Sequence, residues 1–155
     1  MEMSRRSLSD WAAIAEIAGT VAIFVSLIFV VVSIRQNTAQ LRLQNENFIF
    51  QLQDSARADF VSNPWLVDIS VKFDNGEELT LPEQKRFFGH TVRYVNVWEM
   101  IFYWNQSGHI EEQSWRDWDE YYSSDIESWL PKDLWAELRP TYPPGFAEHV
   151  DRQYK

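Results

Sequence analysis

The stretch that decides the fold runs from Trp11 to Ile34, WAAIAEIAGTVAIFVSLIFVVVSI. From Ile17 onward it contains no charged residue and no proline. Hydrocarbon cannot hydrogen-bond the backbone, so a lone segment in a bilayer has to be helical. About 20 apolar residues cross a hydrocarbon core of about 30 Å. The sequence therefore predicts one transmembrane helix over 11–34. A cleaved signal peptide fits less well, because the run is too long and no small-residue cleavage site follows it.

Small residues recur along one face of this predicted helix at heptad spacing, with Phe29 between the last two. They are Ala15, Gly19, Ala22, Ser26 and Ser33. Lipid gains nothing from small side chains, whereas two helices gain a close approach of their backbones. The pattern predicts self-association through this face. The alternative is that small residues are simply common in membrane helices.

Glu16 is the one acidic residue of the predicted span. Ionisable side chains are costly in hydrocarbon and usually face protein or water. The simpler interpretation places Glu16 shallow in the bilayer, where it reaches headgroup water or a neighbouring helix. The other is a ring of Glu16 carboxylates that lines a proton or ion path in an oligomer. We favour the first, because a single anchor helix makes a poor pore unless the oligomer is large.

The charge of the chain lies outside the predicted span. Residues 35–155 hold 20 acidic and 12 basic residues, a net charge of −8. Such a domain is repelled by phosphate, so we expect no nucleic-acid partner. There is no cysteine, which excludes disulfides and cysteine metal sites. Two arginines flank each end of the span, so the positive-inside rule leaves the orientation open.

A stalk helix is predicted over 35–62, because no glycine or proline interrupts the chain there. Heptad spacing appears at Leu41, Asn45, Phe48 and Leu52. The dense glutamines and asparagines of this stretch fit either a solvated helix face or a polar coiled-coil seam, and both interpretations stay open. The segment 1–10 is short and polar, and we expect it to be mobile.

Residues 63–155 are predicted to form a small acidic, aromatic-rich helical domain around one long central helix. A short helix begins at Pro64. Thr80 and Glu83 match the capping box that starts the central helix, and Gly108 is suited to end it. The central helix is apolar on most sides, which is typical of a buried helix. No strand pattern is present, so the fold class is all-α.

The sequence offers no catalytic, cofactor-binding or metal-binding residues by motif. Its three histidines are scattered, and no metal-ligand spacing or phosphate-binding loop is found. Tryptophan and tyrosine dominate interface hot spots, so part of the aromatic set is a candidate partner interface. The alternative is that a small domain uses large side chains to fill its core. The candidate interface residues are Trp115, Trp118, Tyr122, Trp129 and Trp135.

The N-terminal helix resembles the start of a large group of small, uncharacterised bacterial single-span membrane proteins. The aromatic segment from Gly108 to Trp115 is similar as well. The motifs carry no known activity. The resemblance implies an inner-membrane protein whose N-terminus lies outside and whose domain is cytoplasmic. The matching N-terminal motifs are Trp11, Ile14-Ala15-Glu16, Gly19, Ser26-Leu27 and Ile34 to Thr38.

From these features we expect a non-enzymatic, membrane-anchored assembly or scaffold protein that needs no cofactor. Its partners would be membrane lipid and copies of itself, which associate through the anchor and the stalk. The first alternative is an accessory subunit of a larger membrane complex that docks through the aromatic domain. The second alternative is an oligomeric channel or sensor.

Overall fold

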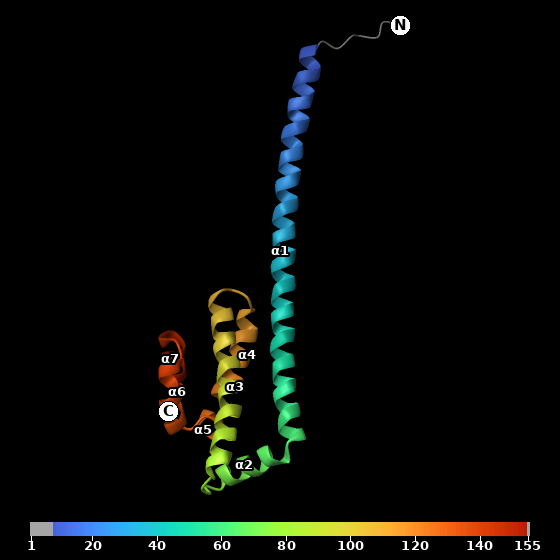
Figure 1. Ribbon diagram of the computed structural model, residues 1–155. Helices are drawn as coiled ribbons and strands as arrows, with labels where there is room; N and C mark the ends of the chain where they lie inside the picture. Colours follow the sequence, from blue (N-terminus) through green and yellow to red (C-terminus); the bar gives the residue numbers. More distant parts are fainter. Residues whose placement is uncertain (1–7, 155) are drawn as a thin grey trace. The chain divides into compact units, whose positions relative to one another are not determined.

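The computed structural model of the protein describes residues 8–154, and this part of the chain is all-α, as predicted (Figure 1). The chain divides into two units, Met1–Leu41 and Arg42–Lys155, and the first helix, α1 (Leu8–Ser62), contributes to both. The segment 1–10 predicted to be mobile lies largely outside the described residues; its last three residues belong to α1. The remaining helices are α2 (Pro64–Asp74), α3 (Leu81–Gln106), α4 (Glu112–Ser123), α5 (Ile126–Trp129), α6 (Lys132–Leu138), η1 (Arg139–Thr141) and α7 (Pro144–Asp151).

The first unit is the apolar part of α1. Among the described residues, α1 contains the one segment long and apolar enough to cross a membrane; its most apolar 18 residues have a mean hydropathy of 2.7, and none of them is buried. Two of its hydroxyl groups are satisfied within the helix. Thr20 Oγ1 donates to the Glu16 carbonyl at 2.9 Å, and Ser26 Oγ donates to the Ala22 carbonyl at 2.8 Å. The surface that this helix presents is therefore almost entirely side-chain hydrocarbon.

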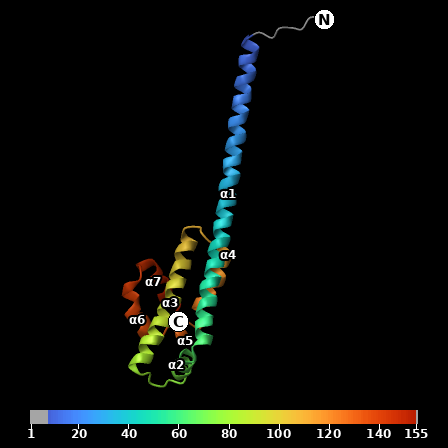
Figure 2. The same ribbon diagram turned by 45° about the vertical axis from the view of Figure 1, so that its right-hand side comes forward.

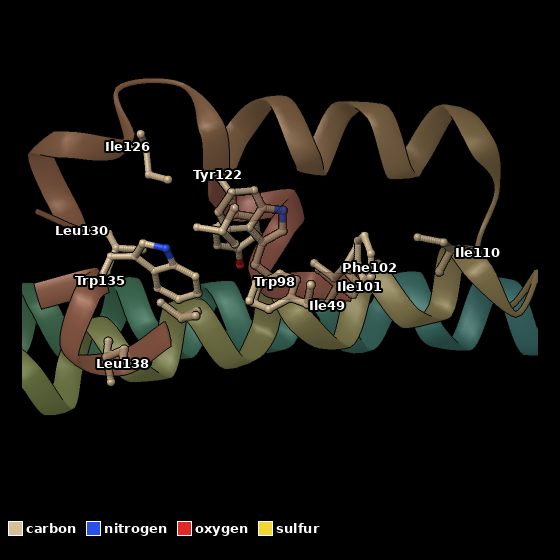
Figure 3. Packing of buried hydrophobic residues seen from close by; sticks show 14 residues of the cluster. Ile49, Trp98, Ile101, Phe102, Ile110, Tyr122, Ile126, Leu130, Trp135 and Leu138 are labelled. Atoms are coloured by element: carbon tan, nitrogen blue, oxygen red, sulfur yellow. The ribbon is translucent and has the colours of Figure 1, made fainter. Parts of the chain in front are cut away.

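The second unit is built around α3, the predicted central helix. In both views α3 lies between the C-terminal part of α1 and the α6–α7 pair (Figure 2). Trp98, Ile101 and Phe102 of α3 are in the buried cluster (Figure 3). Tyr122 of α4 stacks on Trp98 with ring centroids 5.7 Å apart, and Ile49 of α1 lies in the same cluster. The other members of the cluster are Val95, Ile110, Ile126, Leu130, Trp135, Leu138, Phe146, Ala147 and Val150.

The C-terminal part of α1 belongs to this domain. The second unit begins at Arg42, whereas the sequence analysis assigned 35–62 to a stalk outside the domain. The guanidinium of Arg42 donates to the Gly108 carbonyl at 3.1 Å, and the Asn45 amide donates to the His109 carbonyl at 3.0 Å. Among the glutamine and asparagine side chains of this stretch, that of Asn45 therefore binds the turn between α3 and α4. The side chains buried in this part of α1 are Ile49, Gln53 and Ala56.

The ends of α3 are fixed by local chemistry, as predicted. The Thr80 backbone N–H donates to Glu83 Oε2 at 2.8 Å, and a capping box is present. Lys72 Nζ lies 2.8 Å from Glu83 Oε1 and ties α2 to the start of α3. At the other end Gly108 has φ +70°, a left-handed conformation that glycine adopts without steric cost. These two ends set the length and register of the central helix.

Candidate functional site

The residues predicted to associate in the membrane lie on the first unit. Ala15, Gly19, Ala22 and Ser26 are exposed on α1, and Ser33 is half-buried. At about 100° per residue, the spacing of the five places them on one side of the helix. Glu16 is exposed next to this row. From Ala15 to Ser26 the row is thus a strip of small side chains, whereas Phe29, 70% exposed, projects from the same face before Ser33.

The five aromatic residues chosen as a candidate partner interface fall into two groups. Tyr122 and Trp135 are only 1% and 4% exposed, so they are core residues with no surface to offer a partner. This corrects the sequence-based set: a small domain fills its core with large rings. Trp115, Trp118 and Trp129 are half-buried and pack against that core. In this fold the candidate interface is reduced to these three.

The core rings carry polar groups that find partners inside the domain. The Gln53 amide donates to the Tyr122 hydroxyl, and the Trp129 indole donates to the Tyr122 carbonyl at 3.1 Å. The Trp135 indole donates to Asp151 Oδ1 at 2.8 Å, and Arg139 pairs with the same carboxylate. Arg139 is the main reason that the pKa of Asp151 is lowered.

A buried carboxylate–histidine pair was missed by the sequence analysis. His149 Nε2 of α7 lies 2.7 Å from Asp119 Oδ1 of α4, and the Trp98 indole donates to the same oxygen at 2.8 Å. A carboxylate only accepts, so the histidine nitrogen is the donor. Asp119 and His149 are 30 residues apart, and neither lies in a motif. No local sequence signal identifies such a pair.

The hydrogen bonds around the histidines are local packing contacts. The polar contacts of the His149 ring are with Asp119 and Gln153. His109 Nδ1 lies 2.6 Å from Ser107 Oγ, but that hydroxyl also donates to the Tyr103 carbonyl at 2.7 Å. Its proton is therefore directed to the backbone, and the pair caps the end of α3.

His90 is half-buried on α3, beside the ring of Tyr94 at a centroid distance of 5.0 Å. Burial is the main cause that lowers its pKa, with a contribution from Arg93. The imidazole is therefore held in the neutral form. The His90 ring is therefore part of the aromatic packing on α3 and adds no positive charge there.

Within residues 8–154, no group of three or more histidine, aspartate or glutamate side chains is placed to hold a metal ion. Comparison of the chain with protein-family models, with curated proteins and with solved structures gave no match. The features that carry a functional argument are therefore the apolar helix of the first unit and the surface of the second.

Proposed function

We propose that this chain is a non-enzymatic, membrane-anchored assembly protein that associates with copies of itself through the anchor. The observation that carries the proposal is the apolar part of α1, where the most apolar 18 residues are all unburied. Exposing that much apolar surface to water is unfavourable, at roughly 25 cal/mol per Å², whereas lipid accepts it at no cost. The small-residue row gives this anchor one face suited to a second helix.

The proposal places the anchor in the inner membrane and the acidic domain in the cytoplasm. This sidedness is supported by the resemblance of the N-terminal motifs. The internal hydrogen bonds of Thr20 and Ser26 support insertion, because they satisfy these two hydroxyl groups without water.

Cysteine crosslinking in membranes tests the self-association. The chain has no cysteine, so one introduced thiol is unique. Disulfides require Cα atoms within about 7 Å of each other, so only helices that touch at that position will crosslink. We expect Ala22→Cys and Ser26→Cys to give dimers on mild oxidation of membranes that contain the full chain.

Phe24→Cys is the matched control. Position 24 lies between the two test positions in depth, but about 200° around the helix from each. We expect its dimer yield to be several-fold lower. Equal yields at all three positions, or no dimer at positions 22 and 26, would contradict association through this face. Stoichiometric foreign subunits after purification in mild detergent would instead favour the accessory-subunit alternative.

A further inference from the structure

The second unit contains a cavity of about 540 Å³. Its walls come from the end of α1, from α2 and α3, and from the α4–α5 region. The volume falls within the roughly 300–1,000 Å³ range of sites for small organic ligands. All of its lining residues belong to one unit, so the cavity is a property of the domain alone.

The cavity has a buried floor and an exposed mouth. Thr91, Tyr122 and Leu66 form part of the floor and are 2%, 1% and 5% exposed. Val61 and Tyr121 line the mouth and are 79% and 41% exposed. A ligand can therefore enter from solvent and reach the aromatic core.

The walls are largely apolar, and several of their polar groups are already hydrogen-bonded or neutral. The Thr91 hydroxyl donates to the Trp129 carbonyl at 3.3 Å. The Tyr122 hydroxyl accepts a bond from Gln53. His90 is held neutral by burial, which lowers its pKa. A polar ligand would find few partners here, whereas a hydrocarbon chain would replace water against aromatic rings.

Arg57 is the one lining residue with a full charge, and no carboxylate lines the cavity. The neighbouring Tyr121 phenol is the main cause that raises the pKa of Arg57. Among the described residues no carboxylate oxygen pairs with Arg57, whereas Arg93, Arg116 and Arg139 are each paired with an acid. Asp54, three residues earlier on α1, contributes to the raised pKa of Arg57 but forms no ion pair with it. The guanidinium can therefore pair locally with one anion at the mouth, although the net charge of the domain opposes anions.

We propose that this cavity binds a single-chain anionic amphiphile, with its hydrocarbon chain against the aromatic floor and its carboxylate or phosphate head on Arg57 at the mouth. The enclosed volume suits one chain rather than the two chains of a bilayer phospholipid. The assignment depends on the second unit only. It does not rest on self-association of the anchor, so either proposal can fail while the other stands.

Equilibrium dialysis of the full chain in phosphatidylcholine nanodiscs tests the assignment. The probes are radiolabelled dodecanoate and, as the uncharged match, radiolabelled dodecanol; uptake by empty discs is subtracted. We expect saturable uptake of one dodecanoate per chain, with dodecanol bound about fivefold more weakly, since an exposed ion pair contributes up to about 1 kcal/mol. Absence of saturable dodecanoate uptake would overturn the proposal.

Two kinds of variant distinguish binding of the ligand's anionic head group from binding of its hydrocarbon chain. Arg57→Gln should remove the preference for dodecanoate over dodecanol, whereas Arg57→Lys and the control Arg116→Gln, an exposed arginine outside the cavity, should keep it. Ser70→Phe fills the cavity from α2 and should abolish saturable uptake of both probes. An unchanged preference in Arg57→Gln, or unchanged uptake by folded Ser70→Phe, would overturn the assignment.

Discussion

One carboxylate oxygen, Oδ1 of Asp119, serves two donors from different helices. The indole of Trp98 and the imidazole of His149 both approach it, at 2.8 and 2.7 Å. The side chains of His149 and Asp119 are only 11% and 21% exposed, so water competes poorly for these bonds. Hydrogen bonds to a charged group in such surroundings are stronger than neutral ones. This oxygen therefore joins α3, α4 and α7.

Asp119→Asn should destabilise the domain by about 1–3 kcal/mol, because a neutral amide oxygen replaces the charged acceptor while the shape is kept. Urea unfolding followed by near-ultraviolet circular dichroism of the tryptophans measures the change. The control is Asp117→Asn on the same helix, where the exposed carboxylate bonds only to Gln113 one turn away; its effect should stay within about 0.5 kcal/mol. Equal effects of the two substitutions would contradict the role given to Asp119.

The C-terminal part of α1 was predicted as a helix, whereas the face by which it packs into the domain was not predicted. The helix over 35–62 was predicted, and α1 does run to Ser62. The heptad positions Leu41 and Phe48 are 52% and 45% exposed, however, and Ile49 is fully buried instead. Apolar residues occur on several sides of this stretch, so periodicity did not decide between neighbouring faces. Contacts with α3 and α4, remote in sequence, select the face.

Ile49→Ala tests whether this part of α1 is integral to the domain. A fully buried isoleucine truncated to alanine costs about 2–5 kcal/mol, so the unfolding free energy of the domain should fall by that amount. Leu43→Ala, at a position 61% exposed, is the control and should change it by less than about 0.5 kcal/mol. If this part of α1 were a stalk independent of the domain, Ile49→Ala and Leu43→Ala would both change the unfolding free energy by the same small amount.

The N-terminus of α3 should make stability depend on acid pH. The hydrogen bond with Lys72 is the main cause that lowers the pKa of Glu83 from 4.5 to about 2, aided by Thr80. A lowered folded-state pKa means that the stabilisation is present above pH 4.5 and is lost as the pH falls toward 2. The excess stability of the wild type over Glu83→Gln should therefore shrink between pH 5 and pH 2.

Urea midpoints at pH 7 and at pH 2.5 measure this difference. Glutamine can keep the capping box, so the comparison isolates the charge. Lys72→Met removes the main cause of the shift and should also weaken the pH dependence relative to wild type. A gap between wild type and Glu83→Gln that is the same at both pH values would contradict the assignment.

The molecule as a whole combines an exposed apolar helix with a domain that has a buried hydrophobic core. The long apolar helix was predictable because it depends only on local composition, and so were the ends of α3, because a capping box and a glycine act within a few residues. The Asp119–His149 pair and the cavity beside Arg57 were not predictable. Each joins residues that are remote in sequence, and Arg57 carries no local pattern that separates it from a solvated arginine.

The central claim is that the apolar part of α1 lies in lipid. The most direct test is to label single cysteines with a membrane-impermeant maleimide, in bilayers whose two faces are both accessible to the reagent. Phe24 and Leu43 are 63% and 61% exposed on the same helix, so in water Phe24→Cys and Leu43→Cys would react alike. We predict that Leu43→Cys reacts in intact bilayers and that Phe24→Cys reacts only after denaturation in detergent. Equal labelling of the two in the bilayer would contradict the account.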